Sequence, residues 1–111
     1  MMVSIKNHPN YSVTDDGRVY RKPNLSLGYR YLTPDISTGY KRVDLDGTKE
    51  YIARLVLEAF DPPINDSYKV FYIDGDKMNC DLGNLVWLTP SEIQLYSQYT
   101  PEYRRQFLGR W

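Results

Sequence analysis

The sequence is poor in cysteine, histidine and long apolar runs: its 111 residues include one Cys and one His. A lone Cys80 excludes an internal disulfide framework and a structural zinc site within one chain, and it is typical of a reducing compartment. No stretch reaches the roughly 18–20 apolar residues of a transmembrane helix, and the N-terminus lacks the charged-then-apolar pattern of a signal peptide. We therefore expect one compact cytoplasmic domain or two small lobes, without membrane contact.

Charge of one sign is not in excess either, since 14 Lys and Arg balance 14 Asp and Glu. The distribution is uneven: the net charge is +3 over residues 1–49, −5 over residues 50–92 and +2 over residues 93–111. An acidic middle segment repels a phosphate backbone unless a bound metal offsets its charge. Tyrosine is abundant, at 11 residues. Such rings either form a binding surface or fill the core of a small β-rich fold.

The first half of the chain alternates in the period-two manner of short strands. The turn Asp15-Asp16-Gly17 separates the first two segments, and its glycine tolerates a positive φ. Gly or Pro residues bound the other segments, and Tyr29 and Tyr31 are expected to share one face. The pattern predicts a small antiparallel sheet built from residues 11–14, 18–21, 29–32 and 40–45.

Residues 50–60 change to the period of a helix. From Ile52 onward, apolar residues recur at i, i+3, i+4, i+7 and i+8, which is the stripe of an amphipathic helix. Asp61 and the two prolines after it end the pattern, because a residue before proline is pushed out of the helical region. Two short strands, residues 70–73 and 85–88, are expected on either side of a polar loop.

Two helix starts follow these strands. Residues 89–92, Thr-Pro-Ser-Glu, fit an N-cap, a proline in the first helical position and the partner of a capping box. The flanking Leu88 and Ile93 fit a hydrophobic staple. Residues 100–102 repeat the start signal, so we expect a short last helix that ends near Gly109.

Two sets of segments in series resemble one family, the HNH homing endonucleases. Residues 11–20 and 39–45 (Gly-Tyr-Lys-Arg-Val-Asp-Leu) resemble the small β-rich DNA-binding module that precedes many of these enzymes. Residues 53–60 (Ala-Arg-Leu-Val-Leu-Glu-Ala-Phe) and 83–90 (Gly-Asn-Leu-Val-Trp-Leu-Thr-Pro) resemble the HNH nuclease domain itself. The match covers residues 8–93 in the family's order and spacing. Since such genes are common in bacteriophages, the resemblance also implies a phage source.

The resemblance implies a nuclease site in which a His acts as general base and an acidic residue and an Asn or His bind one divalent metal. In this sequence the base falls on Tyr72, the acidic ligand on Phe71 and the helical ligand on Ile93, while a further family His falls on Ala53. Tyrosine is a poor base near neutral pH, and Phe and Ile cannot bind Mg²⁺. We therefore expect no metal cofactor and no catalysis. The family's scaffold residues remain, at Asp74, Gly75, Asn79, Asn84 and Trp87.

Other candidate sites are weaker. His8 lies beside a proline near the N-terminus and is expected to be exposed. The polar loop around Asp74 fails as a calcium loop, because its sixth and twelfth positions are Asn79 and Leu85 where an EF-hand needs Gly and Glu. Its side chains are expected to make turn hydrogen bonds instead. No Gly-rich phosphate loop is present.

The resemblance implies an α+β fold: a small N-terminal antiparallel sheet, then a helix and a degenerate ββα unit with C-terminal helices. Residues 1–49 would form the β-rich module and residues 50–111 the degenerate HNH-like domain. The first module offers a basic, tyrosine-rich surface for DNA or a partner. Its candidate residues are Arg18, Arg21, Lys22, Arg30, Lys41, Arg42, Tyr29 and Tyr31.

We interpret the chain as a catalytically inactive HNH-like binding module. An acidic former active site and many tyrosines favour a protein partner. The first hypothesis is therefore that the chain binds a host or viral protein as an inhibitor, a regulator or a virion component. DNA binding through the N-terminal basic module is the second. A divalent-metal-dependent HNH endonuclease is the third. A viral protein of this kind is expected in the host cytoplasm or in the virion.

Overall fold

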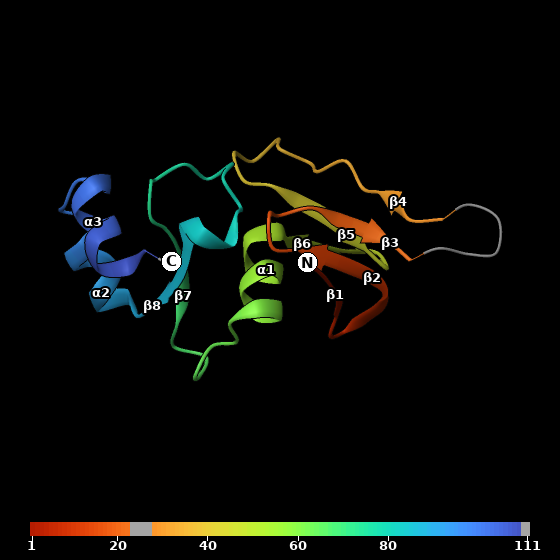
Figure 1. Cartoon of the computed structure of the whole chain (residues 1–111), viewed down its shortest axis with the longest axis horizontal. Helices are drawn as coiled ribbons and strands as arrows, with labels where there is room; N and C mark the ends of the chain where they lie inside the picture. The colour runs from red at the N-terminus through yellow and green to blue at the C-terminus, as the bar shows by residue number, and fades with distance from the viewer. Residues whose placement is uncertain (23–27, 110–111) are drawn as a thin grey trace.

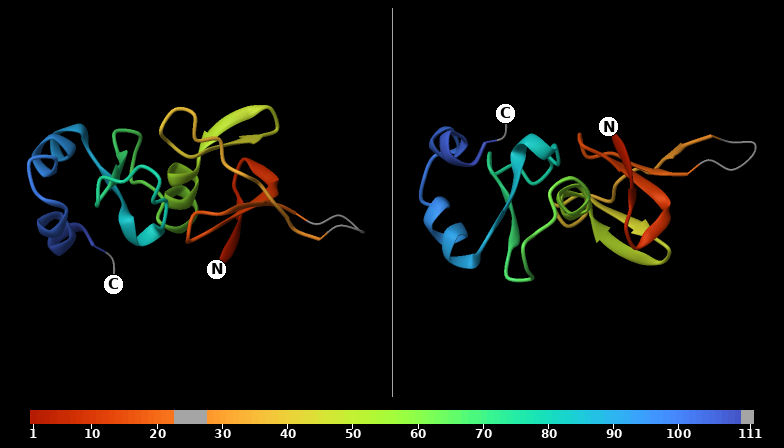
Figure 2. Two further views of the ribbon diagram at one scale, coloured as in Figure 1. Left: turned by 90° about the horizontal axis from the view of Figure 1, so that it is seen from above. Right: turned by 60° about the horizontal axis from the view of Figure 1, so that its bottom comes forward.

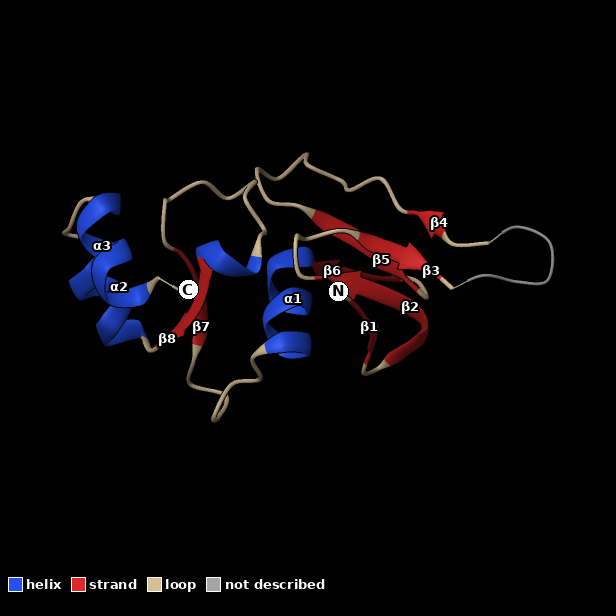
Figure 3. Cartoon of the chain, viewed as in Figure 1, coloured by secondary structure: helices blue, strands red, loops and turns tan. Residues whose placement is uncertain are grey.

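The structure is a computed structural model that describes residues 1–22 and 28–109. It confirms the α+β class, with short antiparallel strands in the N-terminal half and helices at the C-terminal end (Figure 3). In chain order the elements are β1 (Met2–Ile5), β2 (His8–Thr14), β3 (Val19–Arg21), β4 (Arg30–Tyr31), β5 (Arg42–Leu45), β6 (Thr48–Tyr51), α1 (Ile52–Phe60), β7 (Lys69–Tyr72), the 3₁₀-helix η1 (Leu82–Asn84), β8 (Leu85–Leu88), α2 (Pro90–Tyr96) and α3 (Pro101–Leu108).

The predicted N-terminal sheet is present, but as two separate units. One is a four-stranded antiparallel sheet in the order β1-β2-β3-β4, and the other is the hairpin β5-β6. A single bridge between Asp35 and Arg42 connects the segment after β4 to β5. Strands β1 and β6 were not predicted. The turn between β5 and β6 has both Asp46 and Gly47 at positive φ (55° and 86°), which is the tight hairpin turn that an Asp-Gly pair favours.

Helix α1 forms where the amphipathic stripe predicts it. Its apolar face is buried, with Ile52, Leu55 and Val56 all at most 5% exposed. The helix ends at Phe60, and the chain leaves it through Asp61 before the two prolines, as the proline pattern requires. The helix contacts β1, β2 and β6 on one side and β7, η1 and β8 on the other. It therefore packs against both halves of the chain.

The second half contains the predicted strand pair and both predicted helices. Strands β7 and β8 pair antiparallel. Helix α2 begins with a complete capping box, in which the Thr89 side chain accepts from the Glu92 N–H and the Glu92 carboxylate accepts from the Thr89 N–H. Helix α3 begins at the Thr100 N-cap and ends at Gly109. None of the helices in the described ranges is long and apolar enough to cross a membrane.

The molecule is elongated, with extents of 50 × 27 × 27 Å. Figures 1 and 2 show α1 in the middle, the N-terminal strands on one side of it and the β7-β8 pair with α2 and α3 on the other. One cluster of buried side chains extends from Ile5 to Leu85 and passes through α1. The turn between β2 and β3 also meets the second half, because the Leu82 N–H donates to the Asp15 carbonyl (2.8 Å) and Gly17 lies against Cys80.

Candidate functional site

The positions that the resemblance assigns to the family's chemistry lie around one cavity of about 600 Å³. Ala53 is on α1, Phe71 and Tyr72 end β7, and Ile93 is on α2. The fold therefore brings these four positions together from three elements. We call this cavity the cleft. Its lining residues are Tyr40, Tyr51, Ala53, Arg54, Val70, Phe71, Tyr72, Gly75, Lys77, Ile93, Ser97 and Arg104.

Tyr72, at the position of the general base, is half-buried in the cleft. Its ring centre lies 6.2 Å from that of Tyr40. Burial raises the pKa of the Tyr72 hydroxyl above its ordinary value, and the neighbouring Cys80 and Tyr40 raise it further. The hydroxyl therefore stays protonated at neutral pH and has little capacity to take a proton from water.

Phe71, at the position of the acidic metal ligand, is buried and has a cation over its ring. The guanidinium carbon of Arg104 lies 5.2 Å from the centre of the Phe71 ring. Arg104 extends from α3 and donates hydrogen bonds to three carbonyl oxygens, those of Tyr96 (2.9 Å), Ser97 (3.3 Å) and Ile73 (3.3 Å). A fixed positive charge therefore lies beside the position from which the family binds its metal.

The charged side chains of the cleft are all basic. Arg54, Lys77 and Arg104 line it, and none of its described lining residues is a carboxylate. The Lys77 ammonium lies 4.8 Å from the centre of the Tyr40 ring, and Arg54 pairs with Glu58 at 2.7 Å. The expected acidic former active site is thus wrong, because the net charge of a segment does not tell which of its side chains enter a cavity.

The carboxylates of the adjoining loop are used within the loop. The Asp74 carboxylate accepts from the Asp76 N–H (2.8 Å) and from the side-chain amides of Asn84 (2.8 Å) and Asn79 (3.0 Å). Burial raises the pKa of Asp74, but these hydrogen bonds outweigh it, and the pKa lies below its ordinary value. Asp76 accepts from the Met78 N–H (2.9 Å). These are the turn hydrogen bonds that the sequence predicts.

The other scaffold residues also hold the backbone. Asn84 is buried, and its side chain accepts from the Asp74 N–H (2.9 Å) and donates to the Asn79 carbonyl (3.0 Å). Gly75 has a φ of +77°, which glycine adopts without strain. The Trp87 indole donates to the Asp61 carbonyl (2.6 Å). Ile93 is half-buried, and its packing on Leu88 stays a prediction.

A divalent metal of the kind that the family uses does not fit the residues of the cleft. Mg²⁺ requires hard oxygen ligands, whereas an aromatic ring and an alkyl chain occupy the ligand positions at Phe71 and Ile93. Across residues 1–22 and 28–109, no three His, Cys, Asp or Glu side chains gather as a metal site. The Arg104 guanidinium beside Phe71 further opposes a second cation.

A second group of candidate residues lies on one face of the four-stranded sheet. Ser12, Tyr20 and Tyr31 stand directly opposite one another on β2, β3 and β4, so their side chains share a face. The neighbouring residues of the sheet, Val13 and Val19, are fully buried and pack on the other face. The tyrosine face is therefore the outer one.

Aromatic rings and cations alternate on this outer face. The Tyr20 ring makes edge contacts with Tyr31 (5.6 Å) and Tyr29 (6.5 Å), both about half exposed. The neighbouring Tyr20 hydroxyl and the Asp16 carboxylate raise the pKa of the Arg18 guanidinium, and the Lys22 ammonium donates to the Ser4 hydroxyl (2.8 Å). We call these residues the sheet-face cluster: Arg18, Tyr20, Lys22, Tyr29 and Tyr31.

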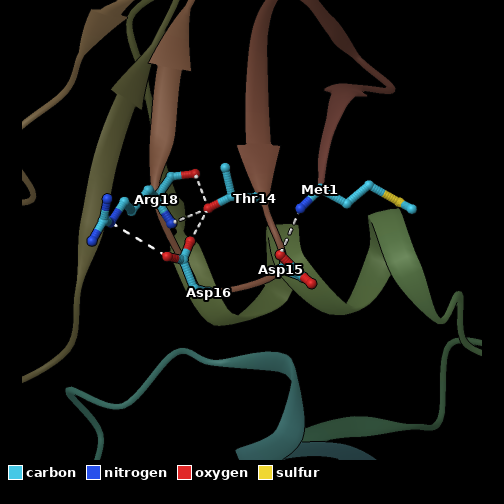
Figure 4. Close-up of polar contacts among 5 residues, drawn as sticks. All are labelled: Met1, Thr14, Asp15, Asp16 and Arg18. Carbon is cyan, nitrogen blue, oxygen red and sulfur yellow. Dashed lines mark hydrogen bonds and ion pairs between the residues drawn. The ribbon is translucent and has the colours of Figure 1, made fainter.

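The turn between β2 and β3 positions Arg18 (Figure 4). The Thr14 hydroxyl accepts from the Arg18 N–H (3.0 Å) and donates to the Asp16 carboxylate. The Arg18 guanidinium lies 3.4 Å from the same carboxylate. At the other side of the turn, the N-terminal amine of Met1 pairs with Asp15 at 3.1 Å. Arg18 is thereby held at the edge of the outer face with 60% of its side chain exposed.

The remaining basic candidates do not join this cluster. Arg21 and Arg30 stand opposite each other on the inner side of the sheet's end, where Arg21 lies over the Tyr11 ring (5.9 Å). Arg42 pairs with Asp35 at 2.8 Å, and Lys41 is half-buried. The basic candidates of the first module therefore lie on more than one part of its surface, and their role in binding DNA or a partner stays a prediction.

Asp35 is held in its charged form. Hydrogen bonds from Ser37, and then from Arg42, lower the pKa of the Asp35 carboxyl to about 2. The charge of Arg42 is consequently neutralised at every pH near neutrality.

His8 also differs from the expectation of an exposed residue. Its ring is half-buried, with Nδ1 3.0 Å from the Asp46 carboxylate and Nε2 3.6 Å from the Glu50 carboxylate. It connects β2 to the β5-β6 hairpin and does not line the cleft.

Comparisons with known proteins agree with this geometry. The HNH endonuclease family model matches residues 50–95. A solved structure described as DNA binding and cleavage by the HNH homing endonuclease I-HmuI matches 99% of this chain, with a TM-score of 0.72 and 28% sequence identity. The chain is a relative of the HNH homing endonucleases. The resemblance inferred from residues 8–93 is thus confirmed.

Among HNH proteins, one viral relative is similar over most of the chain. An uncharacterized HNH endonuclease, L245 of Acanthamoeba polyphaga mimivirus, is 32% identical over 97 residues, which is 83% of this chain. The chain spans 28% of the length of that HNH relative and 62% of the solved HNH chain. A phage source for this chain stays a prediction.

Sequence reasoning missed Arg104 and Lys77 as residues that line the cleft. Arg104 lies beyond the matched residues 50–95, and its approach to Phe71 depends on how α3 folds back. Lys77 lies within a loop whose hydrogen bonds were predicted but whose direction was not. No sequence pattern marks either residue.

Proposed function

We propose that the chain is a DNA-binding relative of the HNH homing endonucleases that holds duplex DNA without cutting it. The observation that carries the proposal is the sheet-face cluster, in which two cations and three tyrosines share the outer face of a four-stranded sheet. The solved relative binds and cleaves DNA, as its description states. In this chain the binding half would persist without the chemistry.

The sheet-face cluster suits a phosphate backbone in charge and in shape. Arg18 and Lys22 flank Tyr20 on the same strand and turn. Arg18 lies 3.4 Å from the Asp16 carboxylate but keeps 60% of its side chain exposed, so both cations can contact phosphates while the rings contact sugars or bases. Strands can enter a groove of DNA. The fixed turn around Thr14 limits the freedom that Arg18 would lose on binding.

Loss of cleavage rests on the cleft. The hydroxyl at the position of the base stays protonated, and the ligand positions hold Phe71 and Ile93. We therefore expect no nicking of supercoiled plasmid with Mg²⁺ or Mn²⁺. Nicking that is abolished by EDTA and by Tyr72→Phe would contradict this part of the proposal.

Binding is tested with a random-sequence DNA duplex by fluorescence anisotropy at several salt concentrations in EDTA. The affinity should fall steeply with salt, and Lys22→Ala should reduce the log–log slope by about 0.9. Tyr31→Ala should weaken binding at all salt concentrations. The charge-matched control is Lys69→Ala, since Lys69 is exposed and lies on β7, outside the four-stranded sheet. Equal behaviour of Lys22→Ala and Lys69→Ala would refute the assigned surface.

A second candidate function, protein binding, is favoured by an aromatic row on the C-terminal helices. The rings of Tyr99, Tyr103 and Phe107 lie in tilted contact, with successive centres 4.7 and 4.9 Å apart, and they are 38%, 43% and 60% exposed. Exposed aromatic side chains of this kind are frequent anchors at protein interfaces. Tyr103→Ser with Phe107→Ser should abolish capture of a protein partner from host lysate while duplex DNA binding persists.

A further inference from the structure

The cleft has a charge pattern that the family's chemistry does not explain. Its three charged lining residues are cations. Arg54 is paired with Glu58, but neither Lys77 nor Arg104 makes an ion pair with any described residue. Two of the three positive charges of the cleft are therefore not held in an ion pair within residues 1–22 and 28–109. Such a site concentrates anions.

Arg104 is fixed before any ligand arrives. Its three carbonyl acceptors come from the end of α2 and from the residue after β7. A guanidinium carries five N–H donors in a rigid fork, so two remain beyond the three already used. Its position over the Phe71 ring keeps the charge at the cleft wall. Little side-chain entropy is lost when a preorganised fork binds an anion.

The rest of the lining suits one nucleotide unit of a DNA strand. A cavity of about 600 Å³ falls within the usual range of about 300–1,000 Å³ for small-ligand sites. The tyrosines Tyr40, Tyr51 and Tyr72 offer ring surface for a sugar or a base. Lys77, 4.8 Å from the Tyr40 ring centre, supplies a second cation on the loop side. No carboxylate among the described lining residues opposes a phosphate.

We propose that Arg104 and Lys77 take over the charge that a metal provides in the family, so that the cleft binds one DNA phosphodiester without a metal. This inference rests on the proposed function for the identity of the strand as DNA. Arginine matches the two oxygens of a phosphate with two parallel hydrogen bonds. It cannot supply a metal-bound hydroxide, and Tyr72 is no base. The phosphodiester would therefore be held and not attacked.

The test is an NMR titration of the full chain with single-stranded tetrathymidylate in EDTA, a probe short enough to report the cleft by itself. The backbone amides of Gly75 and Lys77 should shift on binding. Arg104→Gln and Lys77→Gln should each raise the dissociation constant about tenfold, which is the usual effect of losing one charged hydrogen bond. Arg104→Lys keeps the charge and should lose less, and Lys69→Gln should leave the affinity unchanged.

Thermal melts first establish which variants fold, because Arg104 also connects α2, α3 and β7. If Arg104→Gln unfolds, Lys77→Gln decides, since Lys77 is exposed and holds no backbone. The inference would be overturned if the Gly75 and Lys77 amides shifted only after Mg²⁺ replaced EDTA, or if Lys77→Gln and Lys69→Gln bound tetrathymidylate with equal affinity. Failure of the sheet-face proposal is seen separately: duplex binding would then ignore Lys22→Ala while the Gly75 and Lys77 amides still respond to tetrathymidylate.

Discussion

Asn84→Ala provides the sharpest test of the loop that shapes the cleft. Asn84 is 2% exposed, and its side chain makes three hydrogen bonds: from the Asp74 N–H (2.9 Å), to the Asp74 carboxylate (2.8 Å) and to the Asn79 carbonyl (3.0 Å). A hydrogen bond to a charged group contributes about 1.5–3 kcal/mol and a neutral one about 1 kcal/mol. Asp74 and Asn79 are half-buried, so water partly replaces the lost partner.

The expected loss in the free energy of unfolding is therefore about 3 kcal/mol. For a chain of this length the melting temperature should fall by about 10–15 °C. Urea melts followed by far-UV circular dichroism measure the loss directly. The matched control is Asn65→Ala, an exposed turn residue whose side chain accepts from the Ser67 N–H (2.9 Å), and its cost should stay below about 1 kcal/mol. Equal losses in the two variants would refute the reasoning.

Asn84→Asp adds a pH test of the same contact. The new carboxylate would lie near the Asp74 carboxylate, and two close carboxylates raise one of their pKa values in the folded state. The folded protein then binds more protons than the unfolded chain between that raised pKa and the ordinary value. The variant should accordingly gain stability relative to Asn84→Ala as the pH falls from 7 to 5. A constant difference between the two variants would contradict this.

Three further predictions concern other parts of the fold. Gly17→Ala should lower the free energy of unfolding by about 2–4 kcal/mol in urea melts, because at a φ of +86° the new Cβ would lie 2.8 Å from atoms of Cys80. The control Gly39→Ala, at a φ of +85° with no atom near its Cβ, should lower it by only about 1 kcal/mol; equal losses would disprove the contact. The Asp46 hydrogen bond raises the pKa of His8 above 6.5, so the stability that this contact gives the folded protein is fully present below pH 6.5 and is lost as the pH rises through the folded pKa. Thermal melts of His8→Gln should lack this pH dependence, and a melting temperature that varies with pH as in the parent protein would contradict the prediction. The triple variant Phe71→Asp, Tyr72→His and Ile93→Asn restores the residue types that the family uses. Mg²⁺ should raise its melting temperature only when Arg104→Gln is added, because the Arg104 guanidinium otherwise pairs with the new carboxylate at position 71. A rise in the triple variant by itself would show that Arg104 does not block metal binding.

The local elements were predictable because their signals are local. The stripe of α1, the Gly17 turn and the capping box at Thr89 each depend on residues within a few positions of one another, and each is present. Strand β6 was missed although the Asp46-Gly47 pair is a hairpin signal between two short alternating segments. Strand β1 has no such turn signal, and its pairing with β2 contains an irregularity between Ser4 and Ile5.

The cleft was predictable in position but not in charge. The family resemblance located Phe71, Tyr72 and Ile93, and the fold places them together. It could not indicate that Arg104, 31 residues from its acceptor at Ile73, would reach the cleft. Nor could the net charge of residues 50–92 show that Asp74 is occupied by its own loop. The first depends on a tertiary contact and the second on the order of the residues within the loop, and the net charge of a segment encodes neither.

The contact between Gly17 and Cys80 has a consequence for exchange between relatives. A chimera that joins residues 1–49 of this chain to the nuclease half of another HNH protein would place a foreign side chain against Gly17, and would replace the helix on which both halves pack. Its unfolding should lose cooperativity unless the residues equivalent to Cys80 and Leu82 are transplanted together with the sheet. In this fold, the N-terminal sheet cannot be exchanged as a unit by cutting the chain at residue 49; the transferable unit includes the turn and the loop segment that it touches.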